Sequence, residues 1–203
     1  MADYTLLEYI ESTGTQFIDT GIGNAYEITM DVQFINNGAN EQLMGQSASG
    51  GQYFGINKNG YLENGLSQAF SYLGTERRNI HIIRTQQNQT ITVEGETLIV
   101  DRGGISAVTF KLLGGVGERY PCSAKLYSCQ FYDNGTLVRD YVPCVTSDGE
   151  IGLWDMVEDK FYGNAGTGTF VAGPDVIVPV EPLDPTSMTM GWLVGRAVAS
   201  QRK

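Results

Sequence analysis

A two-residue alternation of apolar and polar side chains is the feature of this sequence that most constrains its fold. In the segment 26–34, four apolar residues alternate with four polar ones: Ile28, Met30, Val32 and Phe34 against Glu27, Thr29, Asp31 and Gln33. Successive side chains of a β-strand point to opposite faces, so this segment predicts a strand with one buried and one solvent-facing side. Similar patterns predict strands at 90–94, 108–112 and 124–132, the last with Tyr127, Cys129 and Phe131 on one face.

Short turn signals separate these segments. Asn-Gly pairs occur at 37–38, 59–60, 64–65 and 134–135, and an Asp-Gly pair occurs at 148–149. Asn, Asp and Gly tolerate the positive φ angles of tight hairpins, and many short strands joined by such turns are typical of all-β sandwiches and barrels. No helical period precedes residue 187, so we expect an all-β domain built as an antiparallel β-sandwich.

Length, charge and cysteine content narrow the class of protein. The 203 residues suffice for one well-buried domain, and the net charge of −10 disfavours binding to nucleic acid or to anionic membranes. The first residues lack the pattern of a secretory signal, and no apolar run is long enough for membrane insertion, so we expect synthesis in the cytoplasm. Cys122, Cys129 and Cys144 are odd in number and lack ligand spacing, which predicts small buried apolar residues.

Three segments are expected along the chain. Residues 1–173 form the sandwich, 174–186 hold four of the six prolines and predict an extended linker, and 187–203 predict a short amphipathic helix. An alternative for the linker is a last edge strand at 176–180, where proline is tolerated. A helix this short is marginal alone in water, so we expect it to dock on a protein partner and to anchor the domain. The anchoring candidates are Met190, Gly191, Trp192, Leu193, Val194, Gly195 and Val198.

Three stretches carry a resemblance to a known family. They are Leu-Glu-Tyr-Ile-Glu-Ser-Thr-Gly-Thr-Gln-Phe-Ile-Asp-Thr-Gly at 7–21, Tyr-Asp-Asn-Gly-Thr-Leu-Val-Arg-Asp-Tyr-Val-Pro-Cys at 132–144, and Gly-Leu-Trp-Asp-Met-Val-Glu-Asp-Lys-Phe-Tyr-Gly-Asn-Ala-Gly at 152–166. They resemble the opening, the late hairpin and the closing segment of laminin-G-like (concanavalin-A-like) domains common in bacteriophage and prophage virion proteins. The resemblance implies a jelly roll of two antiparallel sheets packed face to face.

The same resemblance implies a role. Relatives occur in tail fibres, baseplates and other virion appendages, often as carbohydrate-binding modules. We therefore expect a non-enzymatic virion protein whose lectin-like module binds a glycan or host surface, with other virion proteins as partners and a homo-oligomeric assembly. Two alternatives stay open: a purely structural virion protein that contacts only other proteins, and a bacterial surface lectin, which the missing signal sequence weakens.

Glycan hydrolysis is the least favoured function. Hydrolases of similar shape carry a Glu-x-Asp-x-x-Glu signature; Asp155 and Glu158 match its later positions, but Leu153 stands where the attacking carboxylate belongs. The single histidine, His81, is expected to be an ordinary strand residue. No cofactor is predicted, although calcium stays open because oxygen ligands can come from scattered loop acids. Such acids are Asp19, Asp101 and Asp133.

Glycan binding needs aromatic platforms beside amides and carboxylates that reach sugar hydroxyls. Two regions hold such residues, and the eight candidates are Tyr53, Asn57, Asn59 and Tyr61 in the first region and Trp154, Asp155, Tyr162 and Asn164 in the second. The alternative is structural: the tyrosines cover the sandwich, the asparagines make turns, and the tryptophan lies in the core.

Overall fold

The computed structural model describes residues 4–23, 25–35, 42–48, 52–57, 62–63, 67–68, 74–85, 88–100, 108–114 and 122–176. Within these ranges the chain forms strands and turns and no helix, so the all-β prediction is confirmed. A membrane-crossing helix is likewise not found among these residues. The predicted helix at 187–203, with its seven anchoring candidates, lies outside the described residues, as does the linker beyond residue 176.

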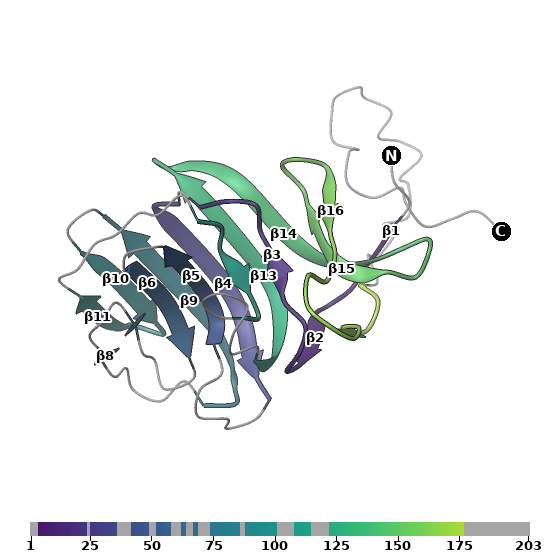
Figure 1. The fold of residues 1–203 in the computed structure, drawn as a ribbon, viewed down its shortest axis with the longest axis horizontal. Coiled ribbons are helices and arrows are strands. Elements are labelled where there is room, and N and C mark those ends of the chain that lie inside the picture. Colours follow the sequence, from purple (N-terminus) through teal and green to yellow (C-terminus); the bar gives the residue numbers. More distant parts are fainter. Residues whose placement is uncertain are drawn as a thin grey trace, which may run out of the picture.

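The larger sheet contains 11 of the described strands, and every recorded pairing is antiparallel. Its main path runs through β11 (Glu96–Val100), β10 (Gln89–Val93), β9 (Arg77–Arg84), β4 (Glu27–Phe34), β13 (Ser123–Asp133), β14 (Thr136–Thr146), β15 (Ile151–Asp155) and β16 (Lys160–Tyr162). Three further strands branch from it: β1 (Tyr4–Leu6) pairs with β14, β2 (Ile10–Thr13) with β13, and β17 (Val171–Ala172) with β2. In Figure 1, β10 and β11 lie at one end of the molecule, and β1, β2, β15 and β16 lie at the other.

The smaller sheet contains six described strands, again with antiparallel pairings. Its order is β3 (Ile18–Asp19), β12 (Lys111–Leu112), β5 (Gln42–Ala48), β6 (Gln52–Asn57), β7 (Leu62–Glu63) and β8 (Ser67–Gln68). Met44, Ile56 and Leu112 from this sheet belong to the same buried cluster as the apolar side of β4. The two sheets therefore share one hydrophobic core.

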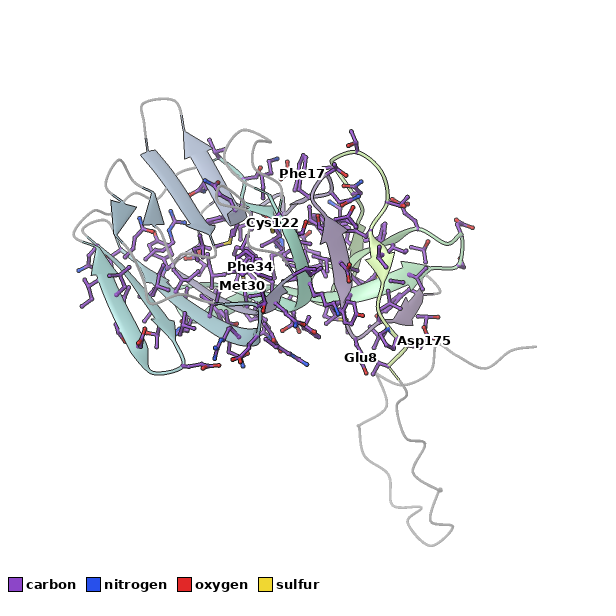
Figure 2. All side chains as sticks on the ribbon, turned by 90° about the horizontal axis from the view of Figure 1, so that it is seen from below. Glu8, Phe17, Met30, Phe34, Cys122 and Asp175 are labelled. Carbon is purple, nitrogen blue, oxygen red and sulfur yellow. The ribbon has the colours of Figure 1, made fainter. Side chains whose placement is uncertain are left out.

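Strand β4 shows why the sequence pattern specifies a face. Its four apolar residues are buried, whereas the four polar residues between them are partly exposed. Figure 2 shows Met30, Phe34 and Cys122 lying between the two sheets. Burying an apolar side chain of this size contributes roughly 1.5–3 kcal/mol. A slip of the register by one residue would expose the four apolar side chains and bury the four polar ones, so it would be strongly destabilising.

One tight turn follows the expected chemistry. Asn134 and Gly135 both have positive φ angles, 48° and 78°, and they join β13 to β14 through the pair Asp133 and Thr136. Positive φ at both central residues is the requirement of a type I′ hairpin turn, which right-handed strand twist favours. The Asn-Gly pairs at 37–38, 59–60 and 64–65 fall on or beside residues that the structure does not describe.

One expectation for 124–132 is wrong. Cys129 and Phe131 are buried, but the register of β13 against β4 shifts between Leu126 and Ser128. This β-bulge adds one residue to β13, so Leu126 and Cys129 both face the core and Tyr127 does not share their face. The Tyr127 hydroxyl instead donates a hydrogen bond to Oε1 of Gln33, on the polar side of β4.

The cysteine prediction is confirmed, because all three thiols are free and buried. Burial raises the pKa of the Cys144 thiol to about 12 and also raises the pKa of Cys129 well above its usual value. The fold therefore holds these two thiols in their neutral form, as expected of packing residues.

The end of the described chain pairs with its beginning. The Glu8 amide donates to the Pro174 carbonyl at 2.8 Å, and the Val176 amide donates to the Leu6 carbonyl at 2.9 Å. Leu7 and Asp175 form an antiparallel bridge between these bonds, and Figure 2 shows Glu8 and Asp175 at the same end of the molecule. Residues 174–176, the first part of the predicted linker, thus extend the larger sheet alongside residues 6–8.

Candidate functional site

The polar sides of six neighbouring strands meet in one row on the outer face of the larger sheet. Residues directly opposite each other in an antiparallel pair point to the same face. Thr29 on β4 is opposite His81 on β9 and Gln130 on β13. The row continues to Thr92 and Thr97 on one side and to Asp140 on the other. We call this row the polar ladder: Thr97, Thr92, His81, Thr29, Gln130 and Asp140.

Hydrogen bonds between neighbouring rungs orient the ladder. The hydroxyls of Thr92 and Thr97 are 3.2 Å apart. The Gln130 amide nitrogen donates to Oδ1 of Asp140 at 3.0 Å, and its amide oxygen accepts from Thr29 at 3.5 Å and from the Tyr132 hydroxyl at 2.8 Å. The Gln130 amide is therefore fixed in one orientation on a rigid sheet, which suits directional recognition.

A hollow of about 430 Å³ lies over the middle of the ladder. Ten residues line it: Thr29, Met30, Asp31, Asn79, Ile80, His81, Thr92, Glu94, Ser128 and Gln130. Asn79 and Ser128 stand opposite Asp31 on its two sides, so they extend the polar surface beside the ladder. Among the described residues, the side chains of Asn79 and Ser128 form no hydrogen bond with one another or with a neighbour, and both line the hollow.

The acids around the hollow are paired. Arg77 binds Asp31 through two parallel contacts, Nε to Oδ1 at 2.8 Å and Nη2 to Oδ2 at 2.5 Å. This hydrogen bonding to Asp31 raises the pKa of the Arg77 guanidinium, despite some desolvation. His81 Nε2 lies 2.8 Å from Oε1 of Glu27, and Glu94 pairs with Arg78. Paired carboxylates keep their positions, but they offer little attraction to a free cation.

An aromatic and cationic cluster closes one side of this surface. The Arg77 guanidinium lies 3.7 Å from the centre of the Tyr127 ring, and the Tyr9 and Tyr127 rings meet edge to face at 5.4 Å. The Lys125 ammonium lies 4.2 Å from the Tyr9 ring centre. Each of these cation–π contacts covers one face of its tyrosine ring, so the cluster forms a wall beside the polar surface.

The second predicted glycan region is engaged by the protein itself. Trp154 is only 5% exposed, and its ring stacks on Tyr4 with centroids 4.5 Å apart. Asp155 is fully buried; its Oδ1 accepts from the amides of Asp140 and Val157, each at 3.0 Å. Its Oδ2 lies 3.3 Å from Nε of Arg139, so the carboxylate stabilises the turn after β15.

Tyr162 and Asn164 also form hydrogen bonds within the protein, in and beside the same hairpin. The Tyr162 hydroxyl donates to Oε2 of Glu158 at 2.6 Å, and burial followed by this contact raises the pKa of Tyr162. Oε1 of Glu158 binds Arg139 at 2.6 Å, so both oxygens of this carboxylate are occupied. Asn164 accepts from the amides of Phe17 and Gly166 and donates to the Gly168 carbonyl, which fixes a turn.

The pairing of β15 with β16 places Asp155 and Tyr162 on one face of the hairpin and Trp154 on the other, and the oxygens of Asp155 and Tyr162 contact protein groups. Of the first predicted region, Tyr53 and Asn57 lie on β6 with undescribed side chains, and Asn59 and Tyr61 lie outside the described residues. Asp101 also lies outside them, while Asp19 pairs with Lys111 and Asp133 accepts from Asn134. Among the described residues, no cluster of three His, Cys, Asp or Glu side chains could hold a metal ion.

The polar ladder was not predicted from the sequence, although the polar side of its central strand was. The polar residues of 26–34 mark a solvent-facing side. Which strands flank them depends on pairings with residues 77–83 and 124–132, which sequence alternation does not specify. Comparison of the chain with protein-family models and with curated protein sequences finds no match.

Proposed function

We propose that the protein is a non-enzymatic binding module of a bacteriophage or prophage virion that presents the polar ladder to a neutral glycan. The observation that carries the binding proposal is the hollow over the ladder, where Asn79 and Ser128 offer unengaged polar atoms beside fixed ones. A glycan is rich in hydroxyls that both donate and accept, and such a surface of amides and hydroxyls matches it.

Charge supports a neutral ligand over an anionic one. Four carboxylates surround the ladder, Glu27, Asp31, Glu94 and Asp140, against the two guanidiniums of Arg77 and Arg78. Both guanidiniums are already bound to carboxylates. A sialic acid, a uronic acid or a phosphate polymer would therefore meet repulsion without gaining a new partner.

The jelly-roll architecture and the virion role belong to the same proposal. Two antiparallel sheets with one shared core are what a concanavalin-A-like or laminin-G-like jelly roll requires. The virion role rests on the resemblance of residues 7–21, 132–144 and 152–166 to domains of phage virion proteins. A single shallow site of millimolar affinity supplies only about −4 kcal/mol, and an array of copies raises avidity by roughly 10² to 10⁴. An oligomeric appendage supplies such an array.

A glycan array followed by titration calorimetry tests the ligand. We expect neutral glycans to bind and Asn79→Ala to weaken binding about tenfold, which corresponds to about 1.4 kcal/mol. Ser128→Ala, in the hollow, is compared with Ser147→Ala, an exposed serine in the turn between β14 and β15. Only the first should weaken binding. Absence of any glycan binding, or equal effects of both serine variants, would contradict the proposal.

The anchoring role of the C-terminal segment is tested by truncation. Because residues 174–176 pair with 6–8, the informative truncation ends at Val176 and keeps those hydrogen bonds. We expect the truncated chain to fold and to bind glycan as a monomer, while the full chain forms the oligomer. Size-exclusion chromatography with light scattering measures this difference, and unchanged assembly of the truncated chain would contradict anchoring.

A purely structural virion protein is the second candidate. Ile83 and Ile99 on the outer face of the larger sheet are 44% and 55% exposed, and such apolar side chains favour protein contacts. If no glycan binds and Ile99→Ser abolishes assembly, this candidate replaces the first.

A further inference from the structure

The polar ladder is long and narrow, in contrast to the compact pocket that a single sugar needs. Its six rungs come from six consecutive strands, β11, β10, β9, β4, β13 and β14. Neighbouring strands are about 4.8 Å apart, so the ladder from Thr97 to Asp140 spans roughly 24 Å. One pyranose ring is about as long as one such spacing. The ladder therefore has the length of a chain of about five sugars.

The two sides of the ladder differ in chemistry. On one side, the next row across the strands contains Ile99, Thr90 and Ile83 and continues to Glu27 and Tyr132. On the other side stand Asn79, Asp31 and Ser128. A pyranose ring also has an apolar C–H face and a hydroxyl edge, so a sugar chain over β9 to β11 would meet the exposed side chains of Ile83 and Ile99 on one side of the ladder.

The two ends of the ladder differ in exposure. β11 is the last strand of the described sheet path, and Thr97 on it is exposed. At the other end, Asp140 is partly buried, and its backbone is held by Asp155 and by the Met156 amide. Among the described strands, Thr97 is therefore the more accessible end of the ladder and Asp140 the more enclosed one.

We infer that the ligand of the polar ladder is a linear, neutral polysaccharide that lies across the strands and occupies about five sugar subsites. This inference rests on the proposed glycan-binding function and adds the shape and direction of the ligand. Each subsite contributes only a few hydrogen bonds of small net strength, so affinity must accumulate along the chain.

The test is a length series. Neutral β-1,4-glucan, α-1,4-glucan, β-1,4-mannan and β-1,4-N-acetylglucosamine oligomers, each from dimer to heptamer, are titrated against the full chain by calorimetry. For at least one series we expect the Kd to fall at least 100-fold from dimer to pentamer and to change less than twofold beyond the hexamer. Equal affinity for dimer and pentamer would overturn the inference and leave the proposed function intact. Absence of binding in every series would overturn both.

Variants at one end separate a ladder from a compact site. Thr97→Ala should weaken binding of the pentamer three- to tenfold and leave the dimer unchanged, since a dimer can occupy the central rungs alone. Thr136→Ala, another exposed threonine at the start of a strand but off the ladder, is the matched control and should change neither. A Thr97→Ala effect that is the same for dimer and pentamer would contradict binding along the strand row.

Discussion

The outer face of β4 and β9 and the β15–β16 hairpin contain similar residue types but use them in opposite ways. In the hairpin, Oδ1 of Asp155 accepts two amide hydrogen bonds, its Oδ2 lies within ion-pair distance of Arg139 without a hydrogen bond, both oxygens of Glu158 contact protein groups, and the Trp154 ring is covered by Tyr4. On the outer face, Asn79 and Ser128 keep unengaged polar atoms within the described structure, and a hollow lies above them. The contrast teaches how to recognise a candidate ligand site. Its polar side chains stand on a rigid sheet but form no hydrogen bonds with other described residues.

The largest expected effect is in the hairpin. Asp155→Ala removes a buried carboxylate that binds two amides and faces Arg139, and breaking a buried ion pair costs about 3–5 kcal/mol. The same change at Asp31, whose partner Arg77 is largely exposed, should cost about 1 kcal/mol or less. Urea denaturation measures both. Equal decreases in the free energy of unfolding would contradict the view that the hairpin carboxylate is structural and the surface carboxylate is not.

The next prediction concerns the pH dependence of the free energy of unfolding, which the buried thiol of Cys144 should influence. The folded state holds the Cys144 proton up to a pKa of about 12, whereas an unperturbed thiol loses it near 9.0. The unfolded chain therefore binds fewer protons across that range, and the free energy of unfolding should fall as pH rises from about 9 to about 12. One proton contributes a slope of about 1.4 kcal/mol per pH unit. Cys144→Ala should flatten the slope by that amount, and an unchanged slope would contradict it.

A smaller effect distinguishes a packed tryptophan from a sugar platform. Tyr4→Ala removes the ring that stacks on Trp154, and the loss of such a pair costs about 1 kcal/mol beyond the buried area. Trp154 fluorescence should shift to longer wavelength as the ring becomes hydrated. Glycan affinity should stay unchanged. A gain in glycan affinity would show that Trp154 is a binding platform that Tyr4 shields, and it would move the site to the hairpin.

The smallest effect on stability is expected in the hollow. Ser128→Ala removes a hydroxyl without a recorded partner in the described chain, so the free energy of unfolding should change by less than about 0.5 kcal/mol. Thermal melting of this variant beside Ser147→Ala measures the difference. A loss above 1 kcal/mol would mean that the Ser128 hydroxyl already supports the fold, and the comparison of the two regions would weaken.

Local features of the sequence predicted local structure well. The alternation of 26–34 specified both faces of β4, and Asn134-Gly135 specified the β13–β14 turn, because each depends on neighbouring residues alone. Contacts between distant segments were not predictable in this way. Tyr4 covers Trp154 from 150 positions away, and the bulge that redirects Tyr127 depends on the register of β13 against β4.

The polar ladder is the clearest example of contacts that local sequence patterns do not predict. His81, Thr29 and Gln130 become neighbours only after three separated segments pair. Each residue alone reads as an ordinary solvent-facing strand position. The sequence therefore predicts that such polar faces exist, and the pairing of the strands decides which polar faces combine into one surface.

The contact between residues 6–8 and 174–176 has a consequence for synthesis of the protein. The ribosome releases residues 6–8 and β2 early, yet their partners at 171–176 emerge 160 or more residues later. Until then this margin of the nascent sheet keeps unsatisfied backbone groups that invite pairing with other chains. Closure of so long a loop is slow, so we expect productive folding to finish after translation and to benefit from chaperones that shield the waiting N-terminal segment.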